Sequence, residues 1–259
     1  MKTKNGFRES YNAQAAGDSK NGIIVASDVS TSGADSDNFS SMVDEITSNV
    51  EEEKIKDSKL VFDAGYLSTE NILKAEEDKI DAYIAPEKDK DYYSDENKDD
   101  NKNKKITAED CKIIKEGDRK ILTCPGGRSF PGFKYCRKGN GRESYYVKVS
   151  TDETCIKCKY YENCKGYLKN KKKDKTFWIE KIKLDNLELI DEFQSKMKSE
   201  EGKKIYSRRM PTIERAFGCI KTVFRYRGTY RRGLIKLKTE WNLICCAYNL
   251  KRMFNLNRR

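Results

Sequence analysis

The chain has no histidine, only four prolines and no long hydrophobic run. Without histidine, Ser-His-Asp hydrolysis, Cys-His proteolysis and zinc catalysis with histidine ligands are excluded. No apolar run approaches the roughly 20 residues that a membrane span needs, and the first residues, MKTKNGFRES, lack the apolar core of a secretory signal. We therefore expect a cytoplasmic protein without a membrane partner, whose nine cysteines are free thiols or metal ligands and not disulfides.

Hydrophobic residues are also scarce, at 36% of 259 residues against 37% charged. This is lean for one close-packed domain, so part of the chain should be solvated or inserted. Residues 1–118 carry 17 basic and 28 acidic side chains, whereas residues 119–259 carry 36 basic and 14 acidic ones. The second part, with a net charge of +22, predicts a polyanionic partner. Nucleic acid is the first candidate, and a plain solvated surface is the alternative.

Strand and helix patterns alternate over the first 86 residues. Turn residues between short apolar runs predict a strand hairpin, and apolar residues at helical spacing predict the helices. In order, we expect a hairpin over 11–29, a helix over 35–49, a strand over 60–63, a helix over 68–77 and a strand over 82–85. This alternation is typical of an α/β domain.

The character of the chain changes after residue 86. A polar, highly charged stretch predicts a solvated linker, and a cysteine-bearing module follows it. Helical periodicity returns after Phe177, with one apolar stripe over 184–193 and another over 234–248. We therefore divide the chain at 1–88, 89–176 and 177–259.

Two carboxylates occupy positions that suit catalysis. Asp63 follows a buried strand and precedes a glycine-containing turn, where α/β proteins often carry functional side chains. Glu214 follows the helix-start signal Pro211-Thr212 and shares a helix face with Gly218 and Lys221. Each position also suits an ordinary turn or first-turn residue.

Several short motifs occur in order along the chain. They are Tyr11-Asn12-Ala13-Gln14-Ala15-Ala16, Asp63-Ala64-Gly65-Tyr66, Asp81-Ala82-Tyr83-Ile84, and the spaced set Tyr206, Arg209, Glu214 and Lys221. This ordered set resembles the catalytic domain of bacterial insertion-sequence DDE transposases, and the last four residues resemble the family's Tyr–Arg–Glu–Lys signature. Each motif is weak alone, but the ordered set covers nearly the whole chain.

The resemblance implies a ribonuclease H-like mixed sheet with flanking helices, interrupted by an insertion before the last catalytic helix. It also implies two-metal phosphodiester cleavage and strand transfer on insertion-element DNA, with Mg²⁺ held by three acids. By this resemblance Asp63 is the second acid and Glu214 the third. The implied partner is double-stranded DNA, both at the ends of the insertion element and at the target, and the implied location is the bacterial nucleoid. Whether the chain forms a homodimer is left open.

The resemblance also places Tyr206, Arg209 and Lys221 near the scissile phosphates. A basic tract with interleaved tyrosines follows, and its arginines are expected to bind phosphate while its tyrosines stack on bases. These arginines are Arg225, Arg227, Arg231 and Arg232. For the lysine-rich run over 169–175, DNA contact and plain surface solubility remain equal alternatives.

The family's first aspartate has no counterpart in this sequence. In the family it lies on a strand before the hairpin, whereas the ten residues before Tyr11 contain no aspartate. Asp18 falls in the hairpin turn, so we expect it to be structural. We therefore expect the C-terminal part of a transposase, lacking the first strand and inactive alone. The alternatives are a non-catalytic DNA-binding zinc protein and a decayed reading frame without a stable product.

Four cysteines predict a structural zinc site in the insertion. Cys155 and Cys158 form a Cys-x2-Cys pair, Cys164 follows, and Cys124 lies in a Cys-Pro-Gly-Gly turn upstream. Such a pair lets two thiolates reach one tetrahedral ion, and a set of free thiols is the alternative. Of the other cysteines, Cys111 and Cys136 have no assigned role, and we expect three in helical stretches to pack in the core: Cys219, Cys245 and Cys246.

Overall fold

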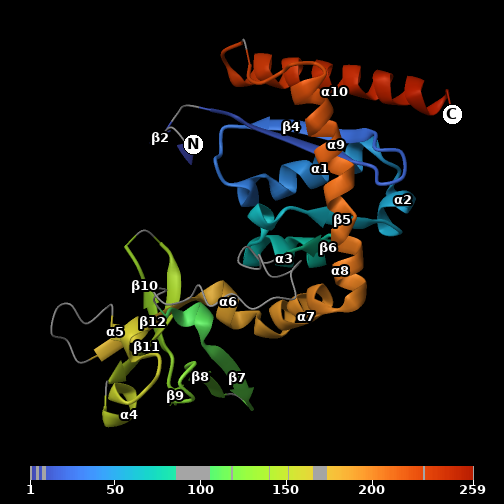
Figure 1. Cartoon of the computed structure of the whole chain (residues 1–259). Helices are drawn as coiled ribbons and strands as arrows, with labels where there is room; N and C mark the ends of the chain where they lie inside the picture. The colour runs from blue at the N-terminus through green and yellow to red at the C-terminus, as the bar shows by residue number, and fades with distance from the viewer. Residues whose placement is uncertain are drawn as a thin grey trace. The chain divides into compact units, whose positions relative to one another are not determined.

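The protein consists of two compact units (Figure 1). The first combines Met1–Ser94 with Leu189–Arg259, and the second is Asp95–Glu188. The computed structural model describes residues 2–3, 6–7, 10–85, 106–117, 119–139, 141–150, 152–165, 174–229 and 231–258. The predicted linker and most of the lysine-rich run lie outside these described residues.

The first unit begins with two antiparallel strand pairs. They are β1 (Lys2–Thr3) with β2 (Gly6–Phe7), and β3 (Asn12–Gly17) with β4 (Ile24–Ser30). Asp18 makes the turn after β3, because its carboxylate accepts the backbone N–H groups of Lys20 at 2.8 Å and Asn21 at 3.0 Å. Gly22 completes the turn with φ at +69°, a conformation that favours glycine. The hairpin and the structural place of Asp18 are thereby confirmed.

Helices and a parallel strand pair follow. The elements are η1 (Asp35–Asn38), α1 (Phe39–Asn49), α2 (Glu52–Lys56), β5 (Lys59–Phe62), η2 (Ala64–Tyr66), α3 (Thr69–Glu77) and β6 (Asp81–Ile84). Ser68 caps α3 by accepting the backbone N–H of Asn71 at 3.1 Å. Strands β5 and β6 run parallel, joined by α3. The predicted alternation of strands and helices is therefore present.

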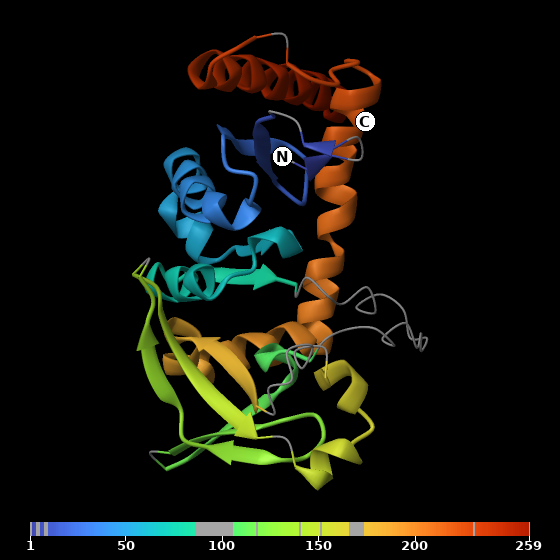
Figure 2. The ribbon, with the colours of Figure 1, turned by 90° about the vertical axis from the view of Figure 1, so that its left-hand side faces the viewer.

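Helix α1 covers one face of the β3-β4 pair and of the β5-β6 pair. Its Met42 and Ile46 pack with Ala26 of β4, and its Phe39 and Val43 pack with Phe62 of β5. Figure 2 shows α1 on one side of the strands and α8 (Glu200–Ser207) and α9 (Arg209–Thr222) on the other. The unit is therefore layered, with helices on both faces of the strands.

The β3-β4 and β5-β6 pairs do not join into one sheet within the described residues. β3 pairs only with β4, and β5 only with β6. Leu60 and Val61 of β5 are half-buried, whereas Tyr83 and Ile84 of β6 are buried. The expected single mixed sheet is thus present as two separate pairs.

Four helices complete the first unit. They are α7 (Leu187–Lys198), α8 (Glu200–Ser207), α9 (Arg209–Thr222) and α10 (Leu234–Leu256). The predicted 234–248 stripe is confirmed, because Leu237, Trp241 and Tyr248 of α10 bury against Ile24 and Val29 of β4. Within the described residues, no helix is long and apolar enough to cross a membrane.

The second unit holds two three-stranded antiparallel sheets, β7-β8-β9 and β10-β11-β12. Its elements are η4 (Ala108–Asp110), β7 (Lys112–Glu116), β8 (Arg119–Thr123), β9 (Ser129–Pro131), β10 (Lys134–Arg137), β11 (Glu143–Ser150), α4 (Glu153–Ile156), α5 (Tyr161–Lys165), β12 (Asp174–Glu180) and α6 (Lys181–Asp185). Leu122, Val147 and Phe177 lie in its core.

The second unit extends past the expected boundary at residue 176. Phe177 and Leu184 pack in its core, so β12 and α6 belong to it. The predicted stripe over 184–193 is also divided. Helix α6 ends at Asn186, whose side chain donates to the backbone carbonyl of Ile182 at 2.8 Å. Phe193, beyond this break, packs in the core of the first unit.

Candidate functional site

Asp63 lies at the end of β5, as its sequence position predicts. One carboxylate oxygen accepts the backbone N–H of Ala64 at 2.7 Å and caps η2. The other oxygen lies 2.6 Å from a guanidinium nitrogen of Arg209 in α9. The Asp63 side chain is 53% exposed and that of Arg209 is 19% exposed. Asp63 is therefore accessible to solvent but already neutralised by a cation of its own chain.

A second acid, Asp35, lies close to the turn that follows Asp63. Its carboxylate accepts the side-chain amides of Asn12 at 2.6 Å and Gln14 at 2.9 Å. A Cβ atom on Gly65 would lie 2.7 Å from the other Asp35 oxygen, so only glycine permits this approach. The glycine of the Asp63-Ala64-Gly65 motif therefore has a packing reason. This contact is the signal by which Asp35 could have been suspected.

Tyr66 connects this network to Asp63. Its hydroxyl donates to the side-chain oxygen of Gln14. Burial raises the pKa of Tyr66 well above its usual value, and the nearby carboxylates of Asp35 and Asp63 raise it further. Tyr66 is therefore a neutral donor at ordinary pH. Sequence analysis missed this network because its members come from β3, η1 and η2.

Glu214 lies on α9, the same helix as Arg209. Its side chain is exposed, as is that of Lys221 two turns later. Across the residues that the structure describes, no group of three or more Asp, Glu, Cys or His side chains is arranged to hold a metal ion. The two expected acids, Asp63 and Glu214, therefore do not form a complete two-ion site with a third described carboxylate.

Tyr206 and Arg209 differ from the expected DNA contacts. Tyr206 is 4% exposed and packs with Tyr83 and Met197, so its burial argues against a direct contact with DNA. The guanidinium of Arg209 faces Asp63. Both side chains are held within the unit because α8 and α9 pack across the strands. Tyr206 meets apolar neighbours there, and Arg209 meets the acidic Asp63. Lys221, in contrast, is exposed.

The basic tract after α9 is exposed at all four arginines: Arg225, Arg227, Arg231 and Arg232. Its Tyr226 does not project as a platform for bases. The Tyr226 ring packs against Trp241 with 6.3 Å between centroids, and Trp241 also stacks on Phe217 at 5.8 Å. Tyr226 therefore anchors the tract to the core of the first unit, while the arginines stay accessible to a phosphate backbone. Tyr230 lies outside the described residues.

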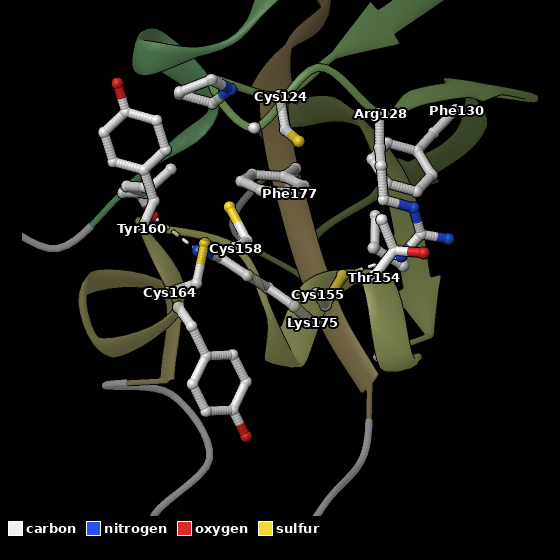
Figure 3. Close-up of a pocket in the computed structure, with 15 residues that line it drawn as sticks. Cys124, Arg128, Phe130, Thr154, Cys155, Cys158, Tyr160, Cys164, Lys175 and Phe177 are labelled. Carbon is white, nitrogen blue, oxygen red and sulfur yellow. Dashed lines mark hydrogen bonds between the residues drawn. The ribbon is translucent and has the colours of Figure 1, made fainter.

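The second unit brings all four predicted zinc ligands to one cavity of about 60 Å³: Cys124, Cys155, Cys158 and Cys164 (Figure 3). Cys124 comes from the turn after β8, and the others come from the segment that includes α4 and α5. A Cβ atom on Gly126 would lie 2.7 Å from the sulfur of Cys158 and 3.6 Å from that of Cys124. Glycine therefore lets the turn approach both thiols.

Two cations lie against these thiols. Arg128 donates to the sulfur of Cys155 at 2.7 Å and pairs with Asp152 at 2.8 Å. Lys175, which is 8% exposed, donates to the backbone carbonyl of Ile106 at 2.8 Å and to the sulfur of Cys164 at 3.5 Å. Burial raises the pKa of the Cys164 thiol, and the neighbouring Lys175 ammonium only partly offsets that effect. Four thiols and two cations therefore meet at this cavity.

Cys111 is a fifth thiol close to this cluster. Burial raises its pKa to about 12, with a further contribution from nearby Cys124. It therefore remains a neutral thiol and packs beside η4 against the core of the second unit. Cys136 lies on β10. In the first unit, Cys245 is buried in the core of α10 and Cys219 is half-buried, but Cys246 is exposed. The expectation that Cys246 packs in the core is wrong, because adjacent helical residues point about 100° apart.

Comparison with protein-family models matched residues 123–254 to the transposase DDE domain. This is just over half of the chain, and it includes Glu214 and the basic tract but not Asp63. No curated protein and no solved structure matched the chain. The chain belongs to the transposase DDE domain family.

Proposed function

We propose that this protein binds insertion-element DNA through its basic tract and does not cleave that DNA on its own. Membership of the transposase DDE domain family supports a role in DNA transposition. The exposure of Arg225, Arg227, Arg231 and Arg232 beside the Tyr226 ring, which packs on Trp241, carries the proposal of DNA contact. Arginines on a fixed support can bind backbone phosphates in any sequence.

We propose that the first unit is a ribonuclease H-like domain. Its parallel and antiparallel strand pairs, with helices on both faces, support this assignment. In that fold Asp63 and Glu214 would be two of three acids that hold divalent metal ions for phosphodiester cleavage.

The described carboxylates do not fit a complete two-ion site. Asp63 is paired with Arg209 at 2.6 Å, and no described group of three acids surrounds it. Asp35 lies near Asp63, but its carboxylate already accepts hydrogen bonds from the side-chain amides of Asn12 and Gln14. We therefore propose that cleavage requires a further carboxylate that these residues do not supply. Family membership and DNA binding are compatible with this absence of catalysis.

DNA binding is tested by the salt dependence of affinity. We compare the chain with a variant carrying Arg225→Ala, Arg227→Ala, Arg231→Ala and Arg232→Ala, using fluorescence anisotropy on a labelled duplex. Each lost phosphate contact lowers the slope of log K against log salt by about 0.9, so we expect a decrease of roughly 3 to 4. Affinity at physiological salt should fall about 10- to 100-fold.

The matched control removes four exposed lysines elsewhere in the first unit: Lys54, Lys56, Lys203 and Lys204. Because it removes the same charge, it separates local contact from general attraction. We expect its salt slope to change by less than about 1. Equal losses in the two variants would reject the basic tract as the DNA site.

A structural zinc ion in the second unit is the second proposal. Four cysteines line one cavity, although among the described residues their side chains are not arranged to hold an ion. Small shifts of the turn at Gly126 would bring the sulfurs to tetrahedral positions about 2.3 Å from one ion. Such an ion would cross-link α4 and α5 to β8 and carry out no chemistry. This observation also favours the alternative function, a non-catalytic DNA-binding zinc protein.

A further inference from the structure

The β10-β11-β12 sheet of the second unit (Figure 1) has one face in the core and one face directed away from it. Val147 of β11 and Phe177 of β12 are buried in the core of this unit. Side chains alternate between the two faces of a strand, so their neighbours Tyr146 and Trp178 lie on the opposite face, which we name the outer face. Trp178 is 45% exposed and Tyr146 is half-buried. The outer face therefore presents large aromatic rings.

The two rings lie side by side across neighbouring strands. Tyr146 and Trp178 are direct partners in the antiparallel register, with 5.1 Å between their ring centroids. A cross-strand aromatic pair of this kind stabilises a sheet. The 45% exposure of Trp178 nevertheless leaves much of its apolar surface in water, so sheet stability alone does not account for the pair. The exposed indole is a surface on which another ring system can stack.

Lysines lie on both sides of the aromatic pair. Lys134 of β10 is the register partner of Tyr146, and Lys148 follows two residues after Tyr146 on the same face. Both lysine side chains are exposed. Among the side chains that the structure describes, Glu180 is the acid placed on this face. The outer face therefore favours an anionic ligand over a cationic one.

Lys138 joins this positive charge to the aromatic pair. Its ammonium, in the turn after β10, lies 4.9 Å from the centroid of the Trp178 ring, within the range of a cation–π contact. Lys138 is exposed, and its flexible stem can carry the ammonium from the ring to a phosphate when a base takes its place. An ammonium beside an exposed indole therefore suits a nucleotide, in which a phosphate and a flat base are joined.

We propose that the outer face binds single-stranded nucleic acid, with an unpaired base stacked on Trp178 and the backbone phosphates held by three lysines: Lys134, Lys138 and Lys148. Exposed aromatic rings accept the π-face of any base, and flanking cations follow the backbone. Bases inside a duplex are already stacked on one another, so this face distinguishes a single strand from a duplex. The outer face belongs to the second unit, whereas the basic tract, the proposed contact with duplex DNA, belongs to the first.

Quenching of tryptophan fluorescence reports this stacking directly. The chain has two tryptophans, and Trp241 is buried, so a stacked base quenches the emission of Trp178. We titrate the whole chain with oligothymidylate of about 12 nucleotides, a length within the range of known single-strand sites. An abasic strand of the same length and the corresponding duplex are the controls, and neither should quench. Oligouridylate supplies the RNA arm, and the tighter of the two strands shows whether the natural ligand is DNA or RNA.

Trp178→Thr removes the ring but keeps a residue that suits a strand. We expect its affinity for oligothymidylate to fall about 10- to 100-fold, and Trp178→Phe, which keeps a ring, to recover most of the loss. Tyr135→Thr is the matched control. Tyr135 is 49% exposed but lies on the opposite face of the same sheet, so this variant should bind like the wild type.

The lysines are tested by the salt dependence of the same titration. Each lost phosphate contact on a single strand lowers the slope of log K against log salt by about 0.7. The triple variant Lys134→Gln/Lys138→Gln/Lys148→Gln should therefore lower the slope by about 2.

Failure of this proposal is distinguishable from failure of the proposed function. The variant that lacks the four arginines of the basic tract should lose duplex binding but keep the quenching by oligothymidylate, whereas Trp178→Thr should show the reverse. Equal quenching by the abasic strand or by the duplex overturns the inference. So does an affinity for oligothymidylate that is the same in Trp178→Thr and Tyr135→Thr.

Discussion

The two units present their candidate sites in opposite electrostatic conditions. At the acid site of the first unit, the Asp63 carboxylate already has a protein cation at 2.6 Å. In the cavity of the second unit, four thiols face only two cations, Arg128 and Lys175. A carboxylate with an internal cation has less need of a metal ion, whereas four cysteines around one cavity are the ligand types of a structural zinc site. The comparison predicts that metal matters for the stability of the second unit and not for that of the first.

The two units also differ in how they are held together. The first has extensive apolar contacts between α10 and β4 and between α1 and both strand pairs. The second has two small sheets with one main apolar core, and its cysteine segment lies at the side of that core. Small domains with limited cores commonly depend on a metal cross-link. The second unit is accordingly where removal of a ligand should have the largest effect.

The largest effect is expected from Cys155→Ser/Cys158→Ser. Loss of a structural zinc site should cost the second unit several kcal/mol and open it to limited proteolysis, while the first unit keeps its protection. Elemental analysis should find about one zinc per wild-type chain and none in the double variant. Cys136→Ser is the control, since Cys136 does not line the cavity. If the wild-type protein contained no zinc and were no more stable than the double variant, the predicted contrast between the two units would be wrong.

An intermediate effect is expected at the buried thiol of Cys245 in the first unit. Burial raises its pKa from 9.0 to about 11. Between these pH values the unfolded state binds fewer protons than the folded state, so the free energy of unfolding falls as pH rises. The fall for this group is at most about 1.4 kcal/mol per pH unit.

Urea unfolding of wild type and Cys245→Ala from pH 8 to 11 measures this dependence. The variant should lose the Cys245 part of the slope, whatever its cost in packing at pH 8. Cys246→Ala should keep the wild-type slope, because Cys246 is exposed. An unchanged slope in Cys245→Ala would show that this thiol is not the packed, neutral group described here.

A smaller effect is expected at the Asp63–Arg209 pair. A double-mutant cycle with Asp63→Asn and Arg209→Met should give a coupling of about 0.5–1 kcal/mol, because Asp63 is half exposed and screened by solvent. The same cycle on the exposed pair Lys59–Glu201, made with Lys59→Met and Glu201→Gln, should give a smaller value. Equal coupling in the two cycles would mean that Arg209 does not neutralise Asp63 selectively.

Local signals in the sequence predicted much of the first unit. The turn at Asp18, the helix expected over 68–77 and the buried face of α10 depend on residues close in sequence, and all three are present. The single mixed sheet was not found, because strand pairing depends on partners far apart in the chain. The division of the 184–193 stripe at Asn186 was also missed, because periodicity alone does not reveal a helix end.

The candidate sites were predictable to different degrees. The closeness of Cys155, Cys158 and Cys164 follows from their short spacing, whereas Cys124 was suggested by its Cys-Pro-Gly-Gly turn and comes from a distant segment. The Asp35–Gln14–Tyr66 network and the Arg209–Asp63 pair join distant segments, so no local pattern reports them. Burial of Tyr206 likewise depends on the packing of α8 against β6. The transposase resemblance named the residues of interest but could not say which of them face inward.

The most direct test of the central proposal measures binding and Mg²⁺-dependent cleavage on the same supercoiled DNA, with the wild type, Asp63→Ala and Glu214→Ala. We predict that all three bind with the same salt dependence and that the wild type cleaves no faster than either variant. Cleavage by the wild type that requires Mg²⁺ and is lost in both variants would contradict the account, since Asp63 and Glu214 would then belong to a working catalytic centre.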